Sequence, residues 1–218
     1  MTTYLLIASL IASVFALLFF YFSTNLIYKK YNKKNINVLN TFTFEATPKL
    51  RSKEGSITYI LFLFLALVLF GVISFVSRFV DVLPIIFLVL VVIMLFCLAF
   101  LPLLSLNKLK EHLYLNLGAI ISFTTASAFL TYLSYSMCKV YDYKNVSLII
   151  ALVVSGLLFL FSLVFVFNPQ LFNFHNETNE KGESVRKKYI PLAFSEWMIL
   201  LSSPLLLIPL ILISSVIK

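Results

Sequence analysis

Three ionisable residues that lie at or within apolar stretches are the best candidates for chemistry in this chain. Glu111 and His112 stand side by side where one apolar stretch begins, and Glu196 lies inside another with Trp197 directly after it. A carboxylate and an imidazole that meet at a membrane surface can bind a lipid headgroup or a polar group of a partner protein. In the alternative interpretation, Glu196 reaches to the headgroups and Trp197 anchors its helix in the aromatic belt of the membrane.

The sequence offers little of what catalysis or metal binding requires. A catalytic zinc site needs about three converging nitrogen, oxygen or sulfur ligands, and the chain has two histidines, His112 and His175. The two cysteines, Cys97 and Cys138, do not form a CxxC pattern, and the motifs GxSxG, GxGxxG and the P-loop are absent. We therefore predict no metal, no cofactor and no enzymatic activity, with a membrane-embedded lipid-modifying enzyme as the alternative.

Six long apolar runs must position these residues. The chain is 61% hydrophobic and 12% charged, whereas an ordinary soluble domain is about a quarter charged. Each run reaches the length of about 20 residues that a helix needs to cross a bilayer. The sequence thus predicts an all-α polytopic membrane protein, a six-transmembrane-helix bundle that forms a single domain over residues 1–218. The predicted helices cover residues 4–28, 57–76, 82–106, 113–137, 146–167 and 190–217, and the basic loops cover 29–56 and 168–189.

Basic residues are distributed unevenly between the two ends of this bundle. Side B, the end that carries the first, third and fifth loops, holds 13 of the 17 lysines and arginines, and side A, the end with both termini, holds four. Loops rich in basic residues tend to stay in the cytoplasm, so the charge pattern predicts a cytoplasmic side B. The cluster from Lys29 to Lys34 favours anionic lipid headgroups. No nucleic-acid-binding motif accompanies it, so we predict membrane lipids as partners and no nucleic acid.

Small residues predict where the helices pack, because close backbone approach drives helix association in lipid. The predicted packing positions are Ala8, Ala12 and Ala16 on the first helix, and Gly118 and Ala126 on the fourth. The fourth helix is also the most polar and carries Asn116, Ser122 and Thr125. Hydroxyl side chains such as those of Ser122 and Thr125 either return hydrogen bonds to their own helix backbone or form, with Asn116, a polar seam along a solute path. The sequence leaves both interpretations open.

Three short motifs resemble the Frag1/DRAM/Sfk1 group of six-helix membrane proteins. They are EHLYLNLGAIISF at Glu111–Phe123, Ser195-Glu196-Trp197 at the start of the last helix, and PKLRSKEG at Pro48–Gly55 in the first loop. The chain departs from the group at Leu113, where an acidic residue often follows the histidine. The resemblance implies a protein of the plasma membrane or endomembranes that modulates lipid handling, maturation of glycosylphosphatidylinositol anchors or autophagy. It also implies a lumenal or exterior first loop, opposite to the charge pattern.

The leading hypothesis from the sequence is a non-enzymatic multipass integral membrane protein with a polar rim on side B. The rim consists of Glu111, His112, Glu196 and Trp197 with residues of the first loop, and it engages lipid headgroups, a partner protein or a second copy of the chain. One alternative is a small transporter or channel subunit with a Ser/Thr-lined path along the fourth helix. The other is a structural subunit of a larger membrane complex.

The orientation of side B can be tested at the sequon Asn176-Glu177-Thr178, because only a lumenal loop is glycosylated. The charge pattern predicts that the chain, made in eukaryotic membranes, shows no mobility shift on endoglycosidase treatment. A shift that is abolished by Asn176→Gln would contradict the charge-based orientation and favour the one that the resemblance implies.

Overall fold

The computed structural model describes residues 2–46, 56–79, 85–104, 109–172, 177–178 and 184–217. Within these residues, six helical segments are long and apolar enough to cross a membrane. The chain is therefore an all-α multipass membrane protein, as predicted. Five of the segments are single helices: α1 (Thr2–Asn32), α4 (Ser56–Arg78), α5 (Ile85–Phe100), α6 (Leu109–Val140) and α7 (Val146–Val166). The sixth consists of α8 (Pro191–Ser202), the 3-10 turn η4 (Ser203–Leu206) and α9 (Leu207–Val216).

Proline explains where two of the helices depart from the predicted boundaries. The third span ends its α-helix at Phe100 and continues as the 3-10 turn η1 (Leu101–Leu103), which contains Pro102. The last span breaks at η4, where Pro204 lacks the N–H that a continuous α-helix would use. Pro209 is the third residue of α9, in the first turn, where no intrahelical N–H bond is required.

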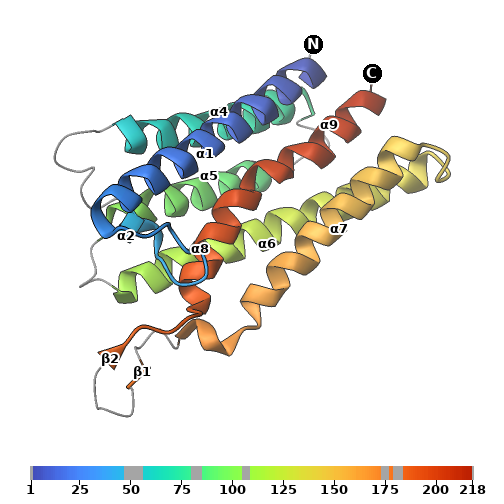
Figure 1. Cartoon of the computed structure of the whole chain (residues 1–218). Helices are drawn as coiled ribbons and strands as arrows, with labels where there is room; N and C mark the ends of the chain where they lie inside the picture. Colours follow the sequence, from blue (N-terminus) through green and yellow to red (C-terminus); the bar gives the residue numbers. More distant parts are fainter. Residues whose placement is uncertain are drawn as a thin grey trace.

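The short elements lie at side B (Figure 1). They are α2 (Thr43–Ala46), the 3-10 turn η3 (Pro169–Phe172), and the two-residue strands β1 (Glu177–Thr178) and β2 (Ser184–Val185). The strands pair antiparallel, with Glu177 opposite Val185. Helix α2 packs against α1, η1 and α8, so the first loop turns back onto the bundle. The predicted basic loop over 29–56 is therefore partly folded structure.

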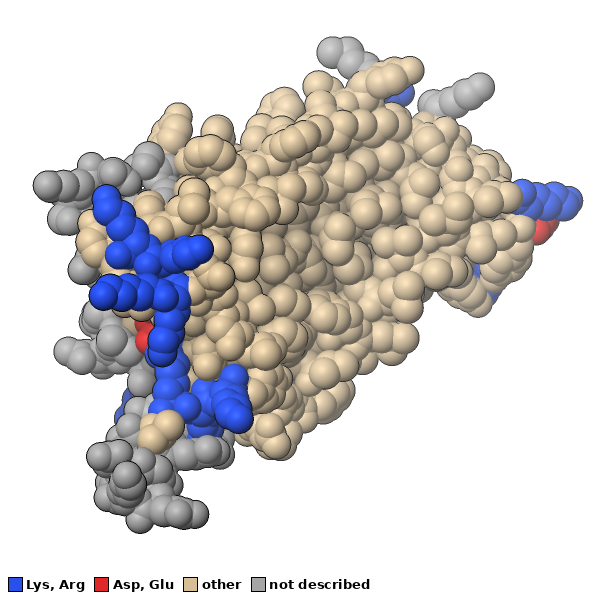
Figure 2. Space-filling model, in the orientation of Figure 1, with Lys and Arg blue, Asp and Glu red and all other residues tan. Residues whose placement is uncertain are grey.

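The long helices run side by side, and both termini lie at side A (Figure 1). Helix α1 packs against α4 and α9, α6 packs against α5 and α7, and α7 also contacts α9. Figure 2 shows the lysine and arginine side chains gathered mainly at the end of the bundle that carries the β1–β2 hairpin. The described part of the chain thus has the charge asymmetry that the sequence predicts.

Small residues do form close helix contacts, but on α1 the predicted positions were wrong. Ala8 is exposed and Ala12 and Ala16 are half-buried, and the buried face of α1 runs along Leu6, Ser9, Ser13, Leu17, Phe20 and Thr24. Gly71 of α4 packs against Ser9, because a Cβ atom built at Gly71 would stand 3.0 Å from the Ser9 Cβ. On α6 the prediction holds: a Cβ at Gly118 would stand 3.0 Å from the Cys97 Sγ, and Ala126 is buried.

This packing predicts that Gly71→Ala destabilises the bundle relative to Gly156→Ala. The added methyl at Gly71 meets the Ser9 Cβ at 3.0 Å, whereas at Gly156 it meets the nearest side chain, Thr131, at 4.0 Å. Both substitutions gain the same helix propensity, so their difference isolates the cost of overpacking, about 1–3 kcal/mol. Unfolding of both variants in detergent micelles measures this difference. Equal stabilities would contradict the close contact between α1 and α4.

Candidate functional site: a buried polar cluster under a folded first loop

His112 and Glu196 meet inside the bundle at side B. His112 lies in the first turn of α6 and Glu196 in the second turn of α8, and the His112 Nδ1 is 3.1 Å from the Glu196 Oε1. Both side chains are 0% exposed. The alternative interpretation, in which Glu196 reaches out to the headgroups, is therefore wrong, and the structure brings His112 and Glu196 of the predicted rim together.

The first loop completes the coordination of the Glu196 carboxylate. Thr43, the first residue of α2, donates to the Glu196 Oε2 from its backbone N at 3.1 Å and from its hydroxyl at 2.8 Å. With His112 on the other oxygen, three groups from α2 and α6 hold this carboxylate of α8. Such hydrogen bonds offset the large cost of removing a carboxylate from water.

Trp197 fixes the same loop from the next position of α8. Its indole Nε1 donates to the Thr41 backbone oxygen at 2.7 Å, and the ring packs edge-on against Tyr21 of α1, with centroids 5.9 Å apart. The side chain is fully buried. The alternative interpretation, in which Trp197 anchors the helix in the aromatic belt, is wrong, because the side chain is buried and its one polar atom is used inside the protein.

Residues 36–46 form a structured lid over this cluster, here named the cap. Its inward-facing side chains are the buried Ile36, Phe42, Phe44 and Ala46. Two hydrogen bonds tie its first part to the bundle: the Ile36 N donates to the Asn25 Oδ1 at 2.8 Å, and the Ile190 N donates to the Leu39 oxygen at 2.8 Å. The folded cap was not predicted from the sequence, although the Thr-Phe-Thr-Phe run at residues 41–44 is an apolar signal within a polar stretch.

Arg186 of the last loop binds the outer surface of the cap. Arg186 donates to both Glu45 carboxylate oxygens, at 2.7 and 2.6 Å, and also to the Asn40 backbone oxygen. The Asn40 amide in turn donates to the Lys187 oxygen at 3.2 Å. A bidentate arginine–carboxylate pair fixes orientation as well as distance. The first and fifth loops therefore behave as one unit at side B.

The polar face of α6 continues one turn below His112. Asn116 is buried and donates from its Nδ2 to the Ser195 hydroxyl at 2.6 Å. The His112 Nε2 and the Asn116 Oδ1 are buried and have no hydrogen-bond partner within the described residues. The carboxylate on Nδ1 favours the tautomer that carries its proton there, which leaves Nε2 as an acceptor. The rings of Phe44 and Phe42 lie against this imidazole, with centroids 4.3 and 6.0 Å away.

Several predicted site residues do not join the cluster. Glu111 is exposed, so the predicted rim lacks one of its carboxylates. Thr125 is exposed while Asn116 and Ser122 are buried, so these residues do not form a continuous seam. The hydroxyls of Thr124, Thr125, Ser127 and Thr131 each donate to the backbone oxygen of α6 one turn back, at 2.6–2.8 Å. These bonds support the interpretation in which the fourth-helix hydroxyls serve their own backbone.

Two sequence predictions fall outside the described residues. Asn176 lies there, as does the whole Pro48–Gly55 motif. Among the residues that the structure does describe, no group of three or more histidine, cysteine, aspartate or glutamate side chains could hold a metal ion.

A hollow of about 640 Å³ opens on the membrane-facing surface between α1 and α4. It is lined by aromatic and aliphatic residues: Phe15, Ala16, Leu18, Phe19 and Phe22 of α1, with Ile60 and Leu63 of α4. Helix α1 runs from side A to side B, so the hollow lies in the half of the bundle nearer to side B. Lys29 and Lys30 follow in the last turn of the same helix.

The chain matches no known protein family, no curated protein and no solved structure. The resemblance to the Frag1/DRAM/Sfk1 group therefore stays a prediction.

The cluster predicts that Glu196→Ala releases the cap. Removal of the carboxylate leaves the Thr43 and His112 donors without their acceptor, which costs about 3–5 kcal/mol for a broken buried pair. Trp197 is the only tryptophan of the chain, so its fluorescence emission should shift to longer wavelength as water reaches the indole.

The matched control is Glu111→Ala, which removes an exposed carboxylate from the position before His112. It should change stability by no more than about 0.5 kcal/mol and leave the emission unchanged. Parent-like stability and emission in Glu196→Ala would contradict the dependence of the cap on this carboxylate.

Proposed function

We propose that this chain is a non-enzymatic multipass membrane protein that binds an anionic lipid at side B. The lipid places one acyl chain in the α1–α4 hollow and its phosphate against the basic cluster from Lys29 to Lys34. The observation that carries the proposal is the position of the hollow directly below these lysines on one helix.

The spacing along α1 fits a phospholipid. Phe15, Phe19, Phe22 and Lys29 follow one another by four, three and seven residues, which keeps them on one face of a helix. Seven helical residues rise about 10 Å, so Lys29 lies beyond the aromatic lining by about the length of a phospholipid headgroup. Each basic residue near an anionic surface contributes about 1 kcal/mol. Apolar contact alone would favour no particular lipid, and the lysines supply the preference.

The buried cluster holds the basic residues in place. Lys33 follows the last residue of α1 with a φ of 56°, and its N donates to the Lys29 oxygen at 2.9 Å. The Asn25–Ile36 hydrogen bond then closes the segment that contains the end of α1 and all four lysines, and the cap beyond it is tied to Glu196 and Trp197. A loop fixed at both ends loses less conformational entropy when it binds a ligand. This gives His112 and Glu196 a positioning role.

The resemblance to the Frag1/DRAM/Sfk1 group agrees with this proposal, because it implies a role in lipid handling. A protein partner or a second copy of the chain that covers the same basic face is the competing explanation. It predicts a complex of fixed stoichiometry on purification, whether or not anionic lipid is present.

The proposal predicts that Lys29→Gln combined with Lys30→Gln weakens retention of phosphatidylglycerol by the purified protein. At about 1 kcal/mol for each lysine, the loss is about 2 kcal/mol, or roughly 30-fold in affinity. Native mass spectrometry of the protein titrated with phosphatidylglycerol and with phosphatidylcholine measures it.

Lys29→Arg combined with Lys30→Arg is the matched control, because it keeps both charges and should keep the preference for phosphatidylglycerol. Ala16→Phe fills the hollow and should weaken retention while every lysine is intact. An equal preference for the two lipids in the parent protein, or no effect of the glutamine variant, would refute the proposal.

A further inference from the structure

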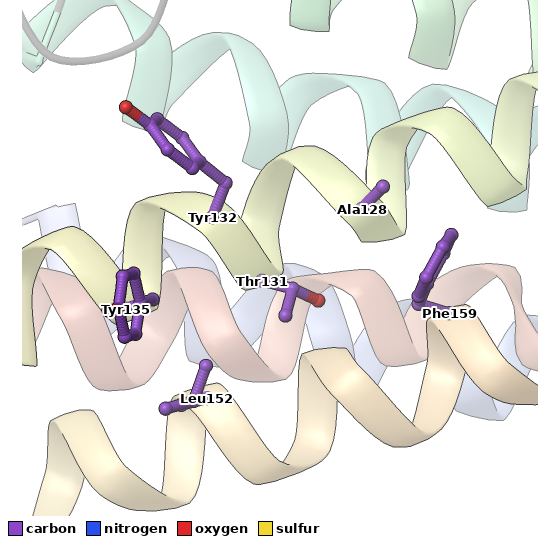
Figure 3. Close-up of a pocket in the computed structure, with 6 residues that line it drawn as sticks. All are labelled: Ala128, Thr131, Tyr132, Tyr135, Leu152 and Phe159. Carbon is purple, nitrogen blue, oxygen red and sulfur yellow. The ribbon is translucent and has the colours of Figure 1, made fainter.

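A second hollow lies between α6 and α7, in the half of the bundle nearer to side A. Its volume is about 320 Å³. Figure 3 shows Thr131 and Tyr135 of α6 pointing toward α7, and Leu152 and Phe159 of α7 pointing toward α6. Ala128 and Tyr132 complete the lining. The hollow is within the size range of known ligand pockets, about 300–1,000 Å³.

Small residues keep this space open. Ala128 contributes one methyl group to the lining, and the Thr131 hydroxyl turns back to the Ser127 oxygen at 2.8 Å. Beside the hollow, Gly156 lets α7 approach α6 closely, since the position of its missing Cβ is 4.0 Å from the Thr131 methyl. Neither helix fills the hollow, so hydrocarbon from the bilayer must supply the missing contacts.

A cation stands at the side A end of the hollow. Lys139 lies in the last turn of α6, and its Nζ is 4.7 Å from the centroid of the Tyr135 ring, which is part of the lining. The nearest acidic residue along the chain, Asp142, faces a different lysine, with its carboxylate 3.7 Å from the Lys144 Nζ. Lys139 thus offers a positive charge to a group that lies directly above the hollow.

We infer that this hollow is a binding site for an anionic phospholipid of the side A leaflet. One acyl chain occupies the space between Thr131 and Leu152, and the phosphate lies against Lys139 over the Tyr135 ring. The site is on other helices and in the opposite half of the bundle from the α1–α4 hollow. It is independent of the function proposed above.

The occupant is an anionic phospholipid because of the charge at one end and the apolar walls below it. A lipid that merely surrounds the protein would exchange freely and show no preference for headgroup. A specifically bound anionic lipid would be displaced by other anionic phospholipid and not by phosphatidylcholine. This difference makes the inference testable.

The test uses the full chain in phosphatidylcholine nanodiscs that contain phosphatidylglycerol with a photoactivatable diazirine on one acyl chain. Cross-linked peptides identified by mass spectrometry should include residues 128–135 or 152–159. Unlabelled phosphatidylglycerol should reduce this cross-linking, and added phosphatidylcholine should not. Lys139→Gln should lower it about fivefold, as expected for the loss of one basic residue near the surface.

Two further variants separate the site from its surroundings. Ala128→Phe fills the hollow and should abolish the cross-link at these peptides, whereas Lys144→Gln removes a neighbouring lysine outside the lining and should leave it unchanged. Lys29→Gln combined with Lys30→Gln should also leave this cross-linking unchanged. Failure of the lipid-binding proposal at side B would therefore not contradict the site between α6 and α7. Equal competition by the two lipids, or no effect of Lys139→Gln, would overturn the inference.

Discussion

Side B depends on the satisfaction of one buried carboxylate. Glu196 lies within a membrane-spanning helix and is 0% exposed, a position that costs several kcal/mol for an ionised group unless hydrogen bonds replace the lost water. The donors come from the Thr43 backbone, the Thr43 hydroxyl and the His112 imidazole. Because these groups belong to the first loop and to α6, the cost of burying the carboxylate can be offset only when α2, α6 and α8 are assembled together.

The other features of side B follow from this assembly. When Thr43 is bound to Glu196, the Thr41 backbone oxygen can accept the hydrogen bond from the Trp197 indole. The Glu45 carboxylate can then accept the hydrogen bonds from Arg186 of the last loop. The cap then covers the polar face of α6 with Phe42 and Phe44, which excludes water from His112. Removal of one bond would weaken its neighbours, because each depends on the same short segment of backbone. Hydrogen-bond networks of this kind are worth more together than their separate members suggest.

The sequence predicted the properties that depend on local composition. The six spans follow from the length of the apolar runs, and the charge asymmetry follows from the basic residues of the loops. The cap could not be predicted, because its key hydrogen bonds join residues that are far apart in the chain. The bond from Thr43 to Glu196 spans 153 positions, and the bond from Trp197 to Thr41 spans 156 positions. The alanine spacing on α1 failed for a different reason: Ser9 and Ser13 are equally small, and composition cannot decide which of two small-residue faces contacts Gly71.

Selectivity of the two membrane-facing hollows for one phospholipid over another needs more than their apolar walls. An acyl chain gains little when it leaves bulk lipid for an apolar groove, since both surroundings are hydrocarbon. Shape alone therefore gives little discrimination among phospholipids. In each case the groove points along its helix to lysine, Lys29 on α1 and Lys139 on α6. The headgroup would then set the preference and the groove would set the position. A charge substitution should change which lipid is bound, and filling of the hollow should change whether any lipid is held there.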